Sequence, residues 1–141
     1  MNFIDTNIFL YAVGEEHPLR KPCQDILRMI GDGALTATSN CEVVQELLYV
    51  LSRRGKLQEG IHLARSILAI FPDLLPVSVK EISLACDLLS KNPGLSVRDA
   101  VHAATMMTCG IRTIISSDRH FDSLPEIHRI DPEDLAKKKD I

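Results

Sequence analysis

Short, mostly apolar segments alternate with longer segments of mixed polarity along the 141-residue chain. The short segments are rich in β-branched residues and end at polar or turn residues, which is typical of buried strands. We expect such strands over residues 3–4, 34–37, 74–77, 113–116 and 127–130. The longer segments repeat apolar residues three or four positions apart, which predicts helices over 6–13, 19–30, 40–53, 56–71, 79–89, 97–109 and 131–139. This alternation predicts an α/β domain, with a central parallel sheet of four to five strands flanked by helices.

Four acidic residues stand at the edges of apolar segments, namely Asp5, Glu46, Asp99 and Asp118. Removing a carboxylate from water is costly unless a positive charge or hydrogen-bond donors compensate for the loss. Mg²⁺ and Mn²⁺ prefer oxygen ligands, so a divalent cation is the natural partner for such a group of acids. Asp5 and Asp118 follow predicted strands, and open parallel sheets bind ligands outside the carboxyl ends of their strands. The pattern therefore indicates a metal-dependent enzyme.

Local structure offers another explanation for some of these acids. Asp5 could cap the helix that follows it, because Asp accepts hydrogen bonds from free backbone N–H groups. Ser39-Asn40-Cys41-Glu42 and Ser96-Val97-Arg98-Asp99 both match a capping box. A capping box would account for Glu42 fully and for Asp99 in part.

Glu46 is the acid that local structure explains least. It lies between apolar ridges of its predicted helix, where the alternative to a functional site is a solvated polar stripe. Asp118 could instead begin a turn. His102 lies one turn after Asp99 on the same helix face, and we expect it to be a polar neighbour of the site rather than a ligand.

Two other hydrolytic mechanisms fit the sequence poorly. Ser, Asp and His occur close together in residues 116–120, but triads are defined by geometry, and the chain has no Gly-x-Ser-x-Gly sequence. A phosphatase-like enzyme with Asp5 as its nucleophile would need a second acid at position 7, where this chain has Asn7. A metal site remains the favoured interpretation.

Composition is that of an ordinary soluble globular protein, with 45% hydrophobic and 25% charged residues. The length fits one domain, and the absence of Trp means that the core must be largely aliphatic. The formal net charge of −3 provides no basic field for nucleic acid. Because acids that bind metal would themselves lower the net charge, this observation counts only mildly against a nucleic-acid substrate.

Cysteine usage and hydropathy indicate a cytoplasmic protein. Cys23, Cys41, Cys86 and Cys109 lack the spacing of a zinc site and stand in apolar surroundings, so we expect four buried, reduced thiols. No apolar stretch reaches the roughly 18 residues that span a bilayer, so no membrane is expected. A strand that begins at residue 2 or 3 leaves no room for a signal peptide.

The acids also lie in motifs that resemble those of the PIN-domain ribonucleases, most closely the VapC-type toxins of prokaryotic toxin–antitoxin pairs. Residues 3–10 are similar to the first strand of that family with its Asp-Thr-Asn sequence. Residues 43–48, 98–104 and 114–121 resemble the second, third and fourth acidic motifs in the same order. The resemblance spans essentially the whole chain. It implies a PIN-like nuclease domain over 1–131, followed by a polar C-terminal tail over 132–141.

The resemblance implies hydrolysis of RNA phosphodiester bonds at a carboxylate pocket that holds one or two Mg²⁺ or Mn²⁺ ions. It also implies a small antitoxin protein as partner and a homodimer. The metal-site residues that carry over are Asp5, Glu46, Asp99 and Asp118. The positions that support the pocket in the family correspond to Asn7 and Ser116.

One position departs from the family pattern. Relatives often have another acid two residues after the fourth motif acid, where this chain has His120. Asp122 is either a replacement for that acid or a surface residue. Without that acid, a second metal ion becomes doubtful. Arg98 and Arg119 each adjoin a pocket acid and are candidates for contacting the RNA backbone, against the alternative of simple solvated charge. A non-catalytic RNA- or protein-binding module and a housekeeping RNA-processing nuclease remain the alternative functions.

Overall fold

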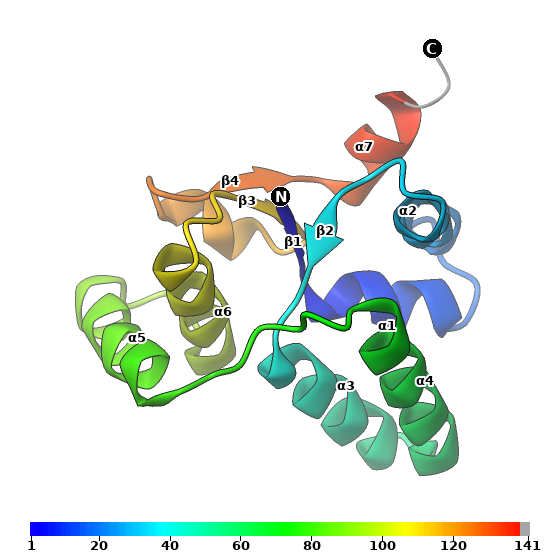
Figure 1. Ribbon diagram of the computed structural model, residues 1–141, viewed down its shortest axis with the longest axis horizontal. Helices are drawn as coiled ribbons and strands as arrows, with labels where there is room; N and C mark the ends of the chain where they lie inside the picture. Colours follow the sequence, from blue (N-terminus) through cyan, green and yellow to red (C-terminus); the bar gives the residue numbers. More distant parts are fainter. Residues whose placement is uncertain (139–141) are drawn as a thin grey trace.

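The computed structural model describes residues 1–138, and its centre is a four-stranded parallel sheet with strand order β2-β1-β3-β4 (Figure 1). Phe3 of β1 pairs with Thr38 on one side and with Ile114 on the other, and Ile114 pairs in turn with Arg129. The strands are β1 (Asn2–Ile4), β2 (Ala37–Thr38), β3 (Thr113–Ile115) and β4 (His128–Ile130). The predicted parallel α/β fold is confirmed.

Helices surround this sheet and pack in pairs, α1 with α2, α3 with α4, and α5 with α6 (Figure 1). In addition, α3 contacts both α1 and α6, which brings residues of these three helices together. Within residues 1–138 the helices are α1 (Thr6–Val13), α2 (Arg20–Gly31), α3 (Cys41–Arg53), α4 (Leu57–Ile70), α5 (Val79–Lys91), α6 (Val97–Thr108), the 3-10 helix η1 (Arg119–Ser123) and α7 (Pro132–Lys138).

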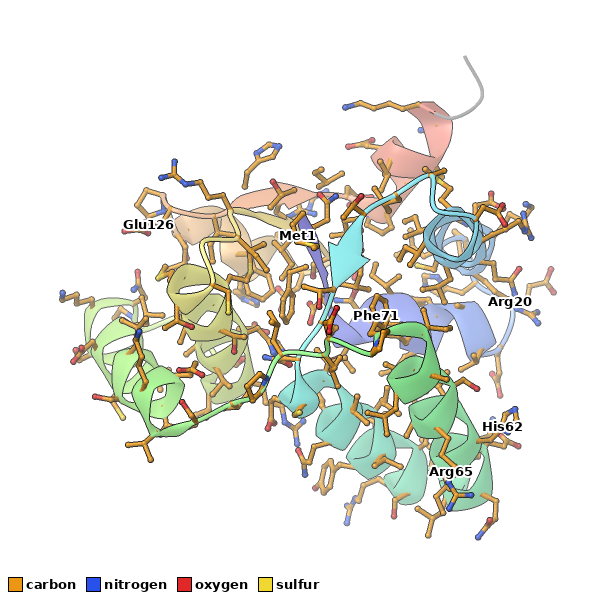
Figure 2. All side chains as sticks on the ribbon, viewed as in Figure 1. Met1, Arg20, His62, Arg65, Phe71 and Glu126 are labelled. Carbon is orange, nitrogen blue, oxygen red and sulfur yellow. The ribbon has the colours of Figure 1, made fainter. Side chains whose placement is uncertain are left out.

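The core lies between the sheet and these helices and is mostly aliphatic, as expected. Phe3, Ile4 and Ile114 are fully buried, because a parallel sheet flanked by helices is covered on both faces. Phe9 of α1 packs edge-on against Phe71, which follows α4 (Figure 2), with ring centroids 6.2 Å apart. This contact fixes the helical pair α3–α4 against α1.

The two strand predictions nearest the edge of the sheet needed correction. Residues 74–77 form no strand, only a single parallel bridge between Leu75 and Asn40. Leu75 bonds to Ser39 and Cys41 through its N–H and carbonyl groups, and the pairing ends there because Cys41 begins α3. The strand predicted over 34–37 is displaced to β2, because the N–H groups of Ala34 and Leu35 both bond to the carbonyl oxygen of Met29 at the end of α2.

The predicted cap of α3 was also wrong by one residue. Asn40, not Ser39, is the N-cap, and its side chain accepts a hydrogen bond from the Val43 N–H group. The Ser39 hydroxyl instead donates to the carbonyl oxygen of Ile4, 2.9 Å away on β1. Glu42 is therefore not part of a capping box. The predicted Ser96 cap of α6 is present, with the N–H group of Asp99 donating to the Ser96 hydroxyl.

Three of the four cysteines are exposed, contrary to the prediction of four buried thiols. Cys23 is buried in α2, whereas Cys41, Cys86 and Cys109 are exposed, and all four are free. Cys41 is the first residue of α3 and Cys109 follows the last turn of α6, so both stand at helix ends rather than on a packed face.

The predicted tail begins as a helix, α7, which packs against α2. Residues 139–141 of that tail lie outside the described residues, and the division of the chain at residue 131 stays a prediction. Among residues 1–138, no helix combines the length and the apolar character needed to cross a membrane.

Candidate metal centre

Asp5 is held at the carboxyl end of β1 by donors on both of its oxygens. The side chain is almost completely buried, and Oδ1 accepts a hydrogen bond of 2.8 Å from the Thr6 N–H group at the start of α1. Oδ2 accepts from the Ser116 hydroxyl at 2.6 Å and from the Asn7 amide at 3.1 Å. Asp5 is thus a helix cap, as the local explanation suggested, and also the centre of a polar pocket.

Ser116 and Asn7 join the end of β1 to the end of β3. The Asn7 amide donates to the Ser116 hydroxyl at 3.1 Å, and its oxygen accepts from the Ser117 N–H group at 3.3 Å. The Ser116 hydroxyl also accepts from the N–H group of Asp118 at 3.0 Å. Adjacent parallel strands end at the same edge of the sheet, so a few short side chains suffice to connect Asp5 with the loop that carries Asp118.

Glu46 reaches the same pocket from α3. Its Oε2 accepts a hydrogen bond of 2.7 Å from the Thr6 hydroxyl, and Nε2 of His102 lies 3.2 Å from the same oxygen. That nitrogen is also 3.8 Å from Oδ1 of Asp5. Glu46 therefore faces other polar groups in the interior instead of continuing the solvated stripe of Tyr49 and Arg53, both of which are exposed.

Asp99, Asp118 and His120 form the outer part of the pocket, with one potential ligand atom from each lying within 4.8 Å of the others. Asp99 is 9% exposed on the first turn of α6. Asp118 caps the short helix η1, and its Oδ1 accepts from the His120 N–H group at 2.9 Å. Nδ1 of His120 lies 2.7 Å from the same oxygen. His120, two residues after Asp118, is therefore placed where it can itself act as a metal ligand.

The acids perturb one another's ionisation. Burial, a hydrogen bond with Asp118 and the charge of Asp5 together raise the pKa of Asp99 to about 7. At Asp118, burial opposes hydrogen bonds from His120 and Asp99, and the bonds prevail, so its pKa is lowered. Burial also raises the pKa of Asp5, against the nearby His102 and the bond from Ser116. Crowded carboxylates need a proton or a cation between them to offset their repulsion. A divalent cation could replace the shared proton, so these carboxylate oxygens fit such an ion.

In the Glu46–His102 pair, hydrogen bonds and neighbouring charges, not burial, determine the direction of both pKa shifts. Burial would raise the pKa of Glu46, but hydrogen bonds from His102 and Thr6 outweigh it and lower that pKa. Burial would lower the pKa of His102, but the bond to Glu46 and the charge of Asp5 outweigh it and raise that pKa. Each group therefore favours the charged form of the other.

Three candidate residues lie beside the cluster of acids and not within it. Asp122 is paired with Arg129, at 2.9 and 3.2 Å, and this arginine also donates to the backbone oxygen of Ser116. Arg98 lies 3.9 Å from Oε1 of Glu46 and stacks over Tyr49. Arg119 is exposed on η1.

Most of the residues that support the acids could not be identified from the sequence. Thr6 belongs to the Asp-Thr-Asn sequence, but its bond to Glu46 joins positions 40 residues apart. Asn40 was part of a suspected capping box, yet no sequence signal linked it to His102, 62 residues further on. Arg129 stands on a strand with no motif around it. These contacts arise from tertiary structure alone.

A groove of about 1430 Å³ begins beside the metal centre, where Asn7 is part of its lining. It is lined by α1, the turn after α1, the end of α3, and α4. Its walls mix apolar residues such as Leu63 with acids such as Glu59 and bases such as Arg54. His62, labelled on α4 in Figure 2, also lines it.

Comparison with known sequences gives consistent matches over most of the chain. A family model described as "PIN domain" matches residues 3–127. Ribonuclease VapC7 of Mycobacterium tuberculosis is 33% identical over 134 residues, which cover 94% of this chain and 92% of the relative. Ribonuclease VapC23 of the same species is 35% identical over 121 residues, covering 84% of this chain and 93% of the relative.

Solved structures share the fold. VapC20 of Mycobacterium tuberculosis, described as a sarcin-ricin loop cleaving toxin, superposes with a TM-score of 0.74 at 17% identity, covering 89% of this chain and 95% of that one. A structure of VapBC2 from Rickettsia felis bound to a DNA fragment from its promoter gives a TM-score of 0.70 at 18% identity, covering 92% of this chain and 96% of that one.

Proposed function

The chain belongs to the PIN-domain family, among the VapC ribonucleases, and from this premise we propose that it is a divalent-metal-dependent endoribonuclease that hydrolyses RNA phosphodiester bonds. We further propose that it is the toxin of a VapBC-type toxin–antitoxin pair. The observation that carries this proposal is the convergence of Asp5, Glu46, Asp99 and Asp118 from four different segments into one pocket. Helix caps account for some of these acids one at a time, but they do not explain why all four lie together in one pocket.

Within the proposed site, Asp5, Asp99 and Asp118 hold Mg²⁺ or Mn²⁺ together with Glu46. His120 offers a further ligand at the position where an acid is missing, and Asp122 is taken up by its ion pair with Arg129. A divalent cation at such a site supplies activation of water and neutralisation of charge on the phosphate.

The surrounding side chains orient these acids. Ser116 and Asn7 fix the Asp5 carboxylate, and the Thr6 hydroxyl fixes Glu46. Arg98 is partly exposed at the rim of the pocket, where its guanidinium group can contact an RNA phosphate. Arg119 is a second candidate for such a contact.

The burial of Asp5 argues against its acting as a covalent nucleophile. Only 4% of the residue is exposed, so a phosphorus atom has little access to its carboxylate. Oδ1 accepts one hydrogen bond, from the Thr6 N–H group, and keeps a lone pair for a cation. Asn7, which stands where a phosphatase-like enzyme would need a second acid, is engaged in the same network. A non-catalytic module would show the same fold but would gain little stability from Mn²⁺ and would not cut RNA. A housekeeping nuclease would cut RNA without an antitoxin partner.

The groove beside the pocket supports a protein partner. Its lining combines apolar residues with both acids and bases, which suits a peptide segment better than a chain of phosphates. We therefore assign it to a segment of the antitoxin, which would approach the pocket past Asn7.

A homodimer and a cytoplasmic location complete the proposal. The molecular mass of the purified protein in solution tests whether it is a homodimer.

The decisive experiment is cleavage of single-stranded RNA by the purified protein with Mn²⁺, with and without EDTA. We expect cleavage that EDTA abolishes and that Asp5→Asn reduces by more than about 100-fold, because loss of a ligand should exceed the 10- to 100-fold cost of losing a residue that merely orients one. Asp134→Asn, at an exposed position of α7, is the matched control and should cut normally. An Asp5→Asn protein that cuts like the wild type would overturn the proposal.

A further inference from the structure

His102 of α6 is a fully buried histidine that connects a helix cap to two carboxylates of the pocket. Its ring packs beside Phe3, with centroids 5.6 Å apart. Nδ1 lies 3.3 Å from the amide nitrogen of Asn40, the N-cap of α3. On the other side of the ring, Nε2 lies 3.2 Å from Oε2 of Glu46 and 3.8 Å from Oδ1 of Asp5.

Asn40 determines which ring nitrogen of His102 carries a hydrogen. Its amide oxygen accepts from the Val43 N–H group at 2.9 Å, as a helix cap must, so its NH₂ group points the other way. That NH₂ group donates to the Thr105 hydroxyl at 2.9 Å and faces Nδ1 of His102. Because an NH₂ group only donates, Nδ1 must accept, and the hydrogen of the neutral ring is on Nε2. A second proton on the ring would leave the Nε2–H group in place.

The Nε2–H group therefore points at the carboxylates of Glu46 and Asp5. We propose that His102 is a positioning residue of the metal centre, whose Nε2–H group and the Thr6 hydroxyl together fix Oε2 of Glu46 and so orient this carboxylate toward the pocket that Asp5 shares. With Oε2 held by both donors, Oε1 is turned toward the rim, where Arg98 lies 3.9 Å away. This inference rests on the proposed function, because it concerns how the same pocket receives its cation.

A purely structural role explains the buried ring less well. A leucine would occupy much of the same apolar space beside Phe3, and Asn40 would keep its partners Val43 and Thr105. The group that would lose a donor is Glu46, whose carboxylate is buried enough for that loss to be felt. The residue that depends on the imidazole for a hydrogen bond is therefore Glu46, which belongs to the site.

The test compares Mn²⁺ binding by calorimetry and RNA cleavage for the wild type, His102→Leu and His102→Gln. We expect His102→Leu to weaken Mn²⁺ binding by about 10- to 100-fold and to lower kcat more than it changes KM. His102→Gln should recover most of both losses, because its amide can donate to Glu46 and accept from Asn40. Met106→Ala, in the apolar core four residues further along the same helix, is the control: it should lose stability and bind Mn²⁺ like the wild type.

Nitrogen NMR of the ring provides a readout that does not depend on metal or on activity. It should show a slowly exchanging hydrogen on Nε2 of His102 in the wild type. A hydrogen found only on Nδ1, or a folded His102→Leu protein with wild-type Mn²⁺ affinity, would overturn the positioning role while leaving the ribonuclease proposal intact. A wild-type protein that binds no Mn²⁺ would instead overturn the proposed function itself.

Discussion

In one half of the candidate metal centre Asp5 and Glu46 each accept a hydrogen bond from a distant part of the chain, whereas in the other half Asp99 and Asp118 lie close together. We call Asp5 and Glu46 the inner half. They receive hydrogen bonds from Thr6, Ser116 and His102. The second pair, the outer half, bonds mainly to neighbours in sequence: the Asp99 N–H group donates to the Ser96 hydroxyl, and the His120 N–H group donates to Oδ1 of Asp118. The His120 side chain is 69% exposed.

This difference indicates which half is preorganised. Carboxylates whose oxygens already accept several hydrogen bonds keep their orientation without a cation. Two carboxylates in contact repel each other unless a proton or a cation lies between them, and the raised pKa of Asp99 reflects this. The inner half should therefore be rigid in the metal-free protein, and the outer half should depend on the ion for its stability.

The largest expected effect comes from Asp99→Asn, which separates activity from stability. Activity should fall by more than about 100-fold, because a ligand is lost where even an orienting residue costs 10- to 100-fold. In EDTA at pH 8, above the Asp99 pKa of about 7, the variant should be at least as stable as the wild type, because the repulsion from Asp118 is gone. Thermal unfolding in EDTA and RNA cleavage with Mn²⁺ check both parts. A variant that is clearly less stable than the wild type in EDTA would show that the outer half is not strained by charge.

Ser116→Ala, in the inner half, should lower the stability of the protein even without metal. The Ser116 hydroxyl donates to Asp5 and accepts from the N–H group of Asp118, and the residue is fully buried. Its loss leaves the buried Asp5 acceptor and the partly buried Asp118 N–H donor each short of a partner, so the free energy of unfolding should fall by about 1–3 kcal/mol, with or without metal. Urea unfolding measures this change. A loss of stability seen only when Mn²⁺ is present would show that the inner half is not preorganised in the metal-free protein.

The fold was largely predictable because its signal is local. Apolar strands that end in acids, and helices with regular apolar spacing, predicted the parallel sheet and the placement of Asp5 and Asp118 at one edge. The errors arose where several local choices were equally good. Ser39 and Asn40 are both good caps, and the choice between them depends on the bond from Ser39 to Ile4 across the sheet.

The site was predictable only in its acids. Glu46 could be singled out because no local structure explained it, but the donors that hold it could not be found from the sequence. The contact between His102 and Glu46 joins positions 56 residues apart. The contact between Arg129 and Ser116 joins β4 to the residue that follows β3, and Arg129 belongs to no motif. Such contacts depend on how α3, α6 and the sheet are packed, and a single sequence carries no pattern for that.

The smallest expected effect is on the pH dependence of stability, and it should belong to the outer half. The pKa of Asp99 is about 7 in the folded protein against an ordinary value of 3.8, so between these values the folded state binds more protons than the unfolded state. The stability that this proton provides is present below pH 3.8 and is lost as the pH rises through about 7. His102, whose pKa is also raised, acts in the same direction.

A cation favours the ionised carboxylates, so Mn²⁺ should raise the melting temperature more at pH 8 than at pH 6. Thermal unfolding at both pH values, in EDTA and in Mn²⁺, measures this difference. Asp99→Asn should reduce it, whereas Ser116→Ala, which lies in the inner half, should lower all four melting temperatures together. Equal stabilisation by Mn²⁺ at pH 6 and pH 8 would mean that no proton is displaced when the ion binds, and that the two halves are preorganised alike.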